Sequence, residues 1–196
     1  MIILASGSPR RRDLLLQIGA SFRVVVSNAA EESGDALPPE ELTVRNASAK
    51  ALAVAAQQPD FPVLGADTVV SLDGHIYGKP GGREDAVRML SELSGRTHQV
   101  TTGIALAVGG RVFTDAAVTE VRFAPLSEAE ILAYVESGEP LDKAGAYAIQ
   151  GKAAVFVESL HGSFSNVVGL PLHAVARLAG KAGVNLYDHY GKGPTG

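Results

Sequence analysis

The sequence predicts an α/β or α+β domain built on one sheet of mixed strand direction. Segments with helical periodicity alternate with β-rich segments along the chain, which is typical of a sheet covered by helices. The turn sequences Asp73-Gly74 and Gly109-Gly110 join β-rich segments into antiparallel hairpins, whereas other β-rich segments stand alone between helices. The chain has 196 residues, of which 46% are apolar, enough to bury a sizeable core.

The first part of the chain begins with a short buried strand that leads into a helix. Ser8 and Pro9 place a capping residue directly before a proline at the first helical position. In the next helix Lys50 lies at the border of an apolar side that contains Leu42 and Ala49, so its amine is expected to leave the core. The predicted elements are a strand at 2–5, a helix from Ser8 to Gly19, a strand at 22–26, a helix at 40–57 and a strand at 63–72.

The second part adds the remaining strands and helices and then a tail. Ser127 and Glu130 form a capping box that begins a helix. From Asn185 onward Gly, Pro and polar residues predict a loose tail, so we expect one domain at 1–184 and a flexible segment at 185–196. The predicted elements are a helix at 84–93, strands at 99–108 and 111–123, a helix at 128–136, a strand at 153–158 and a helix from Pro171 to Ala182.

Composition excludes several classes of protein. Seventeen Lys and Arg against 21 Asp and Glu give a net charge of −4, which argues against nucleic acid or an anionic membrane as the main partner. The chain has no Cys, which excludes thiol nucleophiles and zinc–thiolate sites. The first basic residues, at 10–12, follow the apolar run at the N-terminus, which is the wrong order for a signal peptide. We expect a cytoplasmic protein.

The segment from Ser6 to Arg11 is the first candidate for a binding site. A strand that ends in small residues and runs into a helix N-terminus presents unpaired backbone N–H groups and a positive dipole end. Arg10 and Arg11 add guanidinium groups that suit phosphate oxygens. The alternative is an ordinary cap followed by solvated arginines. Cations at a helix N-terminus are mildly unfavourable because the dipole is positive there. A bound anion would offset this cost, so the placement of the two arginines favours the anion site.

Asp67 is a carboxylate inside an otherwise apolar strand, within Gly65-Ala66-Asp67-Thr68. Such a group is costly to bury without a cation, a metal or a place at the end of a strand. It would suit a metal ligand or a general base for water. A structural carboxylate at a bend beside Gly65 explains the segment equally well.

Other charged and polar residues are weaker candidates. Glu31, Glu32 and Lys50 are, each by itself, more typical of solvated side chains. Lys79 lies in a loop after a hairpin, where binding groups often collect. The amide of Gln150 could contact the edge of a nucleotide base, although a tight connector explains its segment equally well.

Taken together and in this order, these segments resemble the Maf family of nucleoside triphosphate pyrophosphatases. The resemblance spans about residues 2 to 180, and the occurrence of its motifs in register makes it specific. The segments that carry it are Ser6-Gly7-Ser8-Pro9-Arg10-Arg11, Glu32-Ser33, Lys50-Ala51, Gly65-Ala66-Asp67-Thr68-Val69-Val70, Gly78-Lys79-Pro80, Ser94-Gly95-Arg96-Thr97-His98-Gln99-Val100, Asp142-Lys143-Ala144-Gly145, Tyr147, Gln150-Gly151 and Asn166-Val167-Val168-Gly169-Leu170-Pro171.

The resemblance implies an elongated mixed sheet with flanking helices and two lobes around a cleft, as in inosine triphosphatases. It also implies hydrolysis between the α- and β-phosphates of a nucleoside triphosphate, with a divalent cation, Mg²⁺ or Mn²⁺. By the resemblance Asp67 accepts the proton of the attacking water, and Glu32 is a metal ligand together with Asp67. By the same resemblance Lys50 and Lys79, which would hold phosphates, complete the catalytic set with Asp67 and Glu32. Arg11 would also hold a phosphate, and the residues that would bind the substrate are Ser6, Ser8, Arg10, Arg11, Thr68 and Gln150.

Substrate preference within the family is associated with the positions of Arg10, Thr68 and Gln150. All three match the subgroup that acts on dTTP and UTP, and a homodimer is the family's expected assembly. One alternative is the same reaction on 7-methyl-GTP or another modified nucleotide. A second is a nucleotide-binding regulator of cell division that does not catalyse. The choice between Glu31 and Glu32 as the metal ligand is open, with Ser33 favouring Glu32.

Overall fold

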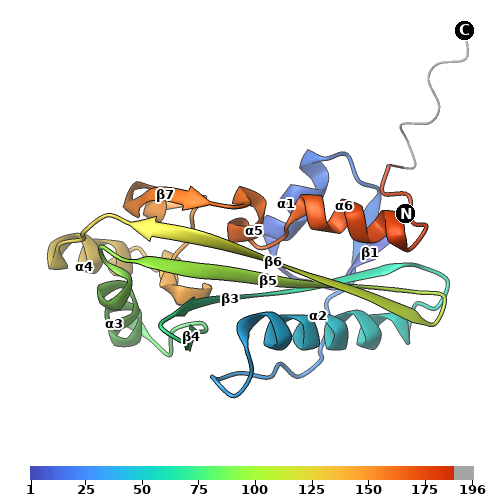
Figure 1. Cartoon of the computed structure of the whole chain (residues 1–196), viewed down its shortest axis with the longest axis horizontal. Coiled ribbons are helices and arrows are strands. Elements are labelled where there is room, and N and C mark those ends of the chain that lie inside the picture. The colour runs from blue at the N-terminus through green and yellow to red at the C-terminus, as the bar shows by residue number, and fades with distance from the viewer. Residues whose placement is uncertain (188–196) are drawn as a thin grey trace, which may run out of the picture.

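The computed structural model describes residues 1–187 and contains one mixed sheet with helices on both faces (Figure 1). This confirms the fold class predicted from the sequence. The strands are β1 (Ile2–Leu4), β2 (Phe22–Val24), β3 (Val63–Leu72), β4 (His75–Tyr77), β5 (Thr97–Val108), β6 (Arg111–Phe123) and β7 (Val157–His161). The α-helices are α1 (Pro9–Gln17), α2 (Pro39–Ala55), α3 (Arg83–Leu93), α4 (Glu128–Glu136), α5 (Phe164–Val168) and α6 (Leu172–Lys181).

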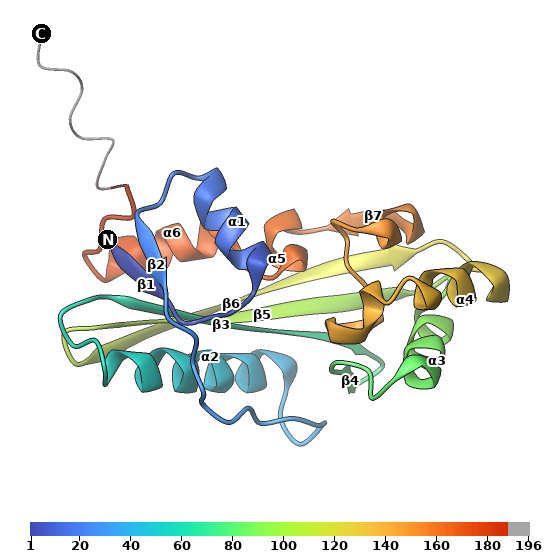
Figure 2. The same cartoon turned by 180° about the vertical axis from the view of Figure 1, so that it is seen from behind.

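The sheet has the strand order β2-β1-β3-β5-β6-β7, and β4 pairs with β3. Strand β1 runs parallel to β2 and β3, and the other pairs are antiparallel. The long strands β3, β5 and β6 follow the long axis of the molecule, with α2 on one face and α1, α5 and α6 on the other (Figures 1 and 2). Helices α3 and α4 pack at the far end, so the structure is elongated as expected.

The alternation of side chains along β3 separates two environments. Val63 packs with residues of α2, whereas Leu64 and Ala66 pack with residues of α1 and α6 on the opposite face. Because successive side chains of a strand point to opposite faces, Asp67 is directed toward α2 and Thr68 toward α1. The two neighbouring residues therefore serve different faces of the sheet.

Two glycines allow α2 to lie directly on the sheet. A Cβ atom at Gly65 would be 2.2 Å from the Ala47 carbonyl oxygen, and a Cβ at Gly103 would be 2.4 Å from the backbone of Thr43. Gly103 pairs with Asp67 across β3 and β5. Helix α2 thus approaches the sheet most closely beside Asp67.

The buried side of α2 differs from the predicted one. Ala49 is only half-buried, and Lys50, expected to direct its amine out of the core, is buried at 8% exposure. Polar partners inside the protein account for this difference, since the helix turns its amine and amide groups toward β3. The buried residues of α2 are Leu42, Thr43, Asn46, Ala47, Lys50, Ala51 and Val54.

The predicted strand at 153–158 is wrong over most of its length. Residues Lys152–Phe156 form a 3₁₀ helix, in which Ala153 and Phe156 are buried at a spacing of one turn. Pairing with β6 begins only at Val157. Between β7 and the last helix the chain forms α5, whose N-cap is Ser163, and the Ser163 hydroxyl oxygen accepts from the Asn166 N–H.

The segment expected as a flexible tail is partly packed. Leu186 is 3% exposed, and its carbonyl oxygen accepts a hydrogen bond from the Ser21 N–H. The remainder of that segment, 188–196, lies outside the described residues. Within residues 1–187, no helix combines the length and the apolar character needed to cross a membrane.

Substitution of Gly103 by Ala should destabilise the protein by several kcal/mol or prevent folding, because the methyl group would meet the backbone of α2. The matched control is Gly180→Ala on α6, where a Cβ has no atom within 4 Å. This control should be neutral or stabilising by up to about 1 kcal/mol. Urea denaturation measures both. Equal stability of the two variants would contradict the close approach of α2.

Candidate active site

A cavity of about 660 Å³ opens where α1, α2 and β3 meet. Nine of the ten predicted site residues line it. These are Ser6, Ser8, Arg10, Arg11, Glu32, Lys50, Asp67, Thr68 and Lys79. The tenth, Gln150, is exposed and does not line this cavity. Apolar walls complete the cavity, formed by residues such as Leu42, Val69, Val70, Val100, Tyr147, Val167 and Val168.

Asp67 and Lys50 form a buried ion pair at the wall of the cavity. The Lys50 Nζ lies 2.7 Å from Asp67 Oδ1, and the side chains are each 10% exposed. Lys50 also contacts Glu31, with 3.0 Å between Nζ and Oε1. Since a buried charge must be paired, one ammonium group stabilises two carboxylates here.

The two glutamates of the acidic segment, Glu31 and Glu32, make different contacts in this structure. Glu31 directs its carboxylate to Lys50, and so to the group that also holds Asp67. The Glu32 carboxylate is 55% exposed and lies 3.8 Å from an Arg45 guanidinium nitrogen. The backbone of Glu32, in contrast, is held by Asn46. The structure therefore brings Glu31 closer to the Asp67–Lys50 pair than Glu32.

A metal at this site would find few protein ligands. The part of the chain that the structure describes contains no group of three or more Asp, Glu or His side chains placed to hold an ion. Asp67 with one glutamate supplies at most two carboxylates. That set fits Mg²⁺, which commonly binds through one or two carboxylates and takes its other ligands from water and substrate phosphates.

Arg11 is half-buried in the wall of the cavity, and each nitrogen of its guanidinium donates a hydrogen bond within the protein. Its Nε donates to the Gly169 carbonyl at 2.7 Å, and its Nη1 donates to the Ala66 carbonyl at 2.9 Å and to Ser6 Oγ at 3.2 Å. Its Nη2 donates to Thr68 Oγ1 at 3.0 Å. Burial lowers the pKa of Arg11, and the charge of Asp67 opposes this shift. The guanidinium ties α1, β3 and the segment after α5 together.

Thr68 continues this network toward β5. Its hydroxyl accepts from Arg11 and lies 2.9 Å from the Thr102 hydroxyl, which also donates to the Asn166 carbonyl. Asn166 is fully buried and donates to Val100 and Thr119. The sequence singled out Thr68 and included Asn166 in a Maf motif, but it gave no sign of Thr102 or Thr119 behind them.

Besides Lys50 and Arg11, the cavity is lined by cations from three separate segments. Arg10 is half-buried, and burial lowers its pKa, while the charges of Asp142 and Glu139 act in the opposite direction. Lys79 is exposed at the rim and, within residues 1–187, forms neither a hydrogen bond nor an ion pair. Lys143 is paired with Asp142. This arrangement provides positive charge at the mouth while Lys50 remains inside.

A buried aromatic group forms the wall near η2 (Ala144–Ala146). The Tyr147 hydroxyl lies 2.8 Å from His98 Nε2, and the His98 ring packs edge-on against Phe123. Burial lowers the pKa of His98 to about 4, so its ring is neutral at pH 7. Burial also raises the pKa of Tyr147. This wall of the cavity is therefore uncharged.

Comparison with known proteins places the chain in a family. The profile of the family described as Maf-like protein matches residues 1–182. The chain belongs to the Maf family. A dTTP/UTP pyrophosphatase of Symbiobacterium thermophilum is 50% identical over 186 residues, 95% of this chain and 96% of that protein.

Two further relatives with the same description are similarly close. The protein of Gloeobacter violaceus is 53% identical over 87% of this chain and 90% of its own length. That of Thermococcus onnurineus is 49% identical over 91% of this chain and 96% of its own length. Among solved structures, the Staphylococcus aureus Ham1 protein is 16% identical, with a TM-score of 0.44, and covers 78% of this chain and 88% of that chain.

Most of the Maf motifs quoted from the sequence contribute residues to the cavity, but the motif at 94–100 does so only through Val100, and Gln150 does not line the cavity. Gln150 lies in a turn in which the Gly151 N–H donates to the Ala148 carbonyl. The turn is held further by Glu139, whose carboxylate accepts from the Lys152 N–H. Asn46, in contrast, lines the cavity but carries no Maf motif. The signal that could have identified Asn46 is its spacing of four residues from Lys50, which puts both on one face of a helix.

Replacement of Arg11 in this Maf protein by Ala should lower the free energy of unfolding by about 3 kcal/mol, since buried carbonyl groups lose their charged donor. The adjacent Arg12 is the control, because its side chain is 56% exposed and, within residues 1–187, pairs only with Asp13. Arg12→Ala should change stability by at most about 0.5 kcal/mol. Chemical denaturation gives both values. A loss of activity without any loss of stability in Arg11→Ala would instead assign Arg11 to the substrate.

Proposed function

We propose that this Maf protein hydrolyses dTTP and UTP between the α- and β-phosphates, giving the nucleoside monophosphate and pyrophosphate. Relatives at 49 to 53% identity over most of the chain carry that description. The observation that carries the proposal is the Asp67 carboxylate, buried at 7% exposure beside a cavity lined by cations. A carboxylate in that position can accept a proton from water next to a bound polyphosphate.

The proposed chemistry is a single displacement at the α-phosphorus. A water oxygen bonds to the phosphorus as the bond to the bridging oxygen breaks, and pyrophosphate leaves with the electrons of that bond. Asp67 takes the proton of the water. The contact with Lys50 fixes the position of this carboxylate before substrate arrives, as a general base requires.

The remaining polar groups suit the phosphate chain. A triphosphate brings about four negative charges, so binding requires several cations and N–H donors. Arg10 and Lys79 line the cavity, and the N-terminus of α1 adds its backbone N–H groups. The Ser8 hydroxyl, which makes no hydrogen bond within the described residues, is available at the same point. Ser6 instead accepts from the Ser8 N–H and from Arg11.

A divalent cation, Mg²⁺ or Mn²⁺, is part of the proposal. Asp67 and a glutamate of the acidic segment, Glu32 by family resemblance or Glu31 by its contact with Lys50, would hold it. When bound, such an ion neutralises charge on the phosphate oxygens. The structure's own contribution is to keep these carboxylates together by means of Lys50.

Base preference for pyrimidines rests on Arg10 and Thr68, which line the cavity, and on Gln150, which does not. The Thr68 hydroxyl is engaged with Arg11 and Thr102, so its influence on the base would be through the position of β3. Action in the cytoplasm and assembly as a homodimer are included in the proposal from the family resemblance. The lack of Cys is consistent with a reducing compartment.

Product analysis by ion-exchange chromatography tests the proposal. Incubation with dTTP and UTP should yield monophosphate and pyrophosphate with Mg²⁺, and EDTA should abolish both products. CTP, 7-methyl-GTP and ITP serve as comparison substrates. Preference for a purine would contradict the assignment of the base, diphosphate with phosphate would contradict the reaction, and no product from any nucleotide would favour a binding regulator.

Asp67→Asn should lower kcat by about 1,000-fold, because the amide cannot accept the proton of water. Binding of a non-hydrolysable triphosphate analogue should persist, as the cations at the cavity mouth are unchanged. Asp60→Asn, at an exposed surface position, is the control and should leave kcat unaltered. Steady-state kinetics and calorimetry measure the two quantities. Turnover by Asp67→Asn near that of the control would exclude Asp67 as the base.

A further inference from the structure

Asn46 is a buried polar residue at the active site whose side chain has every hydrogen-bonding group engaged. It is 3% exposed. Its Nδ2 donates to Asp67 Oδ2 at 2.9 Å and to the Glu32 carbonyl at 2.9 Å, and its Oδ1 accepts from the Glu32 N–H at 2.8 Å. The side chain thus joins the buried carboxylate to the backbone of the acidic segment.

The chemistry of these partners fixes the orientation of the amide. Asp67 Oδ2 and the Glu32 carbonyl are both acceptors, so the NH₂ group must face them. The Glu32 N–H is a donor and requires the amide oxygen. A rotated amide would place oxygen against two oxygens, and the arrangement therefore has one orientation.

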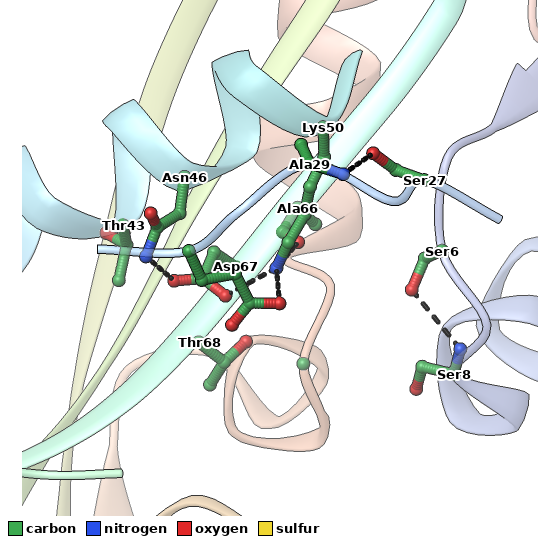
Figure 3. A network of polar contacts seen from close by, with 12 residues as sticks. Ser6, Ser8, Ser27, Ala29, Thr43, Asn46, Lys50, Ala66, Asp67 and Thr68 are labelled. Atoms are coloured by element: carbon green, nitrogen blue, oxygen red, sulfur yellow. Dashed lines mark hydrogen bonds and ion pairs between the residues drawn. The ribbon is translucent and has the colours of Figure 1, made fainter. Parts of the chain in front are cut away.

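Helix α2 holds the two Asp67 oxygens with two different side chains. Lys50 contacts Oδ1 and Asn46 contacts Oδ2, and the two side chains are one helical turn apart (Figure 3). Each carboxylate oxygen can accept more than one hydrogen bond, so capacity remains for water on both. With both oxygens held, rotation of the carboxylate is restricted.

The same two side chains also hold the acidic segment. Lys50 contacts the Glu31 carboxylate, and Asn46 contacts both backbone polar groups of Glu32. An interaction with the Glu32 backbone alone would be explained by packing of a loop. The additional bond to Asp67 is not needed for that purpose, and it reaches the group that takes part in the reaction.

We propose that Asn46 is a positioning residue for hydrolysis, which holds Asp67 Oδ2 and the Glu31–Glu32 segment in a fixed relation so that Asp67 faces the attacking water. The inference rests on the proposed function. Asn46 does not touch the substrate in this assignment and acts through Asp67. Loss of its contacts should therefore affect turnover far more than substrate binding.

Asn46→Leu tests this assignment, since leucine has the same number and branching of side-chain heavy atoms but no hydrogen-bonding groups. We expect kcat to fall about 10- to 100-fold, as is typical when a partner of a reacting group is removed. KM should change by less than about threefold, because Arg10 and Lys79 are unaffected. The matched control is Thr43→Val, also on the buried side of α2, whose hydroxyl bonds, among the described residues, only to the carbonyls of Pro39 and Glu40. It should keep wild-type kcat and KM.

Asn46→Asp provides a second variant of nearly identical shape, in case Asn46→Leu does not fold. It keeps an acceptor for the Glu32 N–H but loses the donor to Asp67, so kcat should again fall at least about 10-fold with KM little changed. Thermal unfolding of each variant verifies the folded state at the assay temperature. Wild-type kcat in either folded variant, or a loss expressed in KM alone, would overturn the role of Asn46.

The two proposals fail in different ways. If the wild-type chain hydrolyses no triphosphate, the proposed function is wrong and the role of Asn46 falls with it. If the wild type hydrolyses dTTP or UTP and Asn46→Leu is equally fast, the role of Asn46 alone is wrong. A kcat loss in both Asn46 variants, with an unaltered Thr43→Val, supports both.

Discussion

The contact of α2 with the sheet is the constraint on which the active site depends. Gly65 and Gly103 lack the Cβ atoms that would hold the helix away, and backbone lies within 2.4 Å of where those atoms would be. At that distance the short amide of Asn46 and the amine of Lys50 both reach Asp67. A longer separation would leave a buried carboxylate without partners, which is among the costliest arrangements in a protein interior.

Strand β3 connects this contact with the rest of the molecule through its alternation. Asp67 serves the α2 face, where the proposed chemistry takes place, and Thr68 serves the opposite face through Arg11. The Arg11 guanidinium in turn bonds to Ala66 and Gly169, so α1 and the segment after α5 are fixed to the same short stretch of β3. Helices α1 and α2 and the segment after α5, which are far apart in the chain, are thereby held around Asp67 and Thr68 of β3.

The positively charged side chains of the cavity lie at different depths. Lys50 is inside and satisfied by Asp67 and Glu31, whereas Arg10 and Lys79 stand toward the opening. This separation allows a chain with a net charge of −4 to present a locally cationic mouth to an anionic substrate. It also keeps the internal ammonium committed to the two carboxylates, so that they are in place before a triphosphate enters.

The sequence by itself determined the mixed α/β class, most of the elements and the family, because turn signals, periodicity and the motifs around Asp67 are local properties of the chain. It could not place Gln150, since whether a loop side chain enters a cavity depends on packing that no local pattern records. The predicted exposure of the Lys50 amine was also wrong. An amine at the edge of an apolar stripe is buried only when another element supplies a carboxylate to pair with it, as β3 does here through Asp67. Tertiary structure alone decided three contacts: that of Asn46 with Asp67, that of Glu31 with Lys50, and those of Arg11 with β3 and Gly169. The reason is that these contacts depend on distances between segments that are far apart in the sequence.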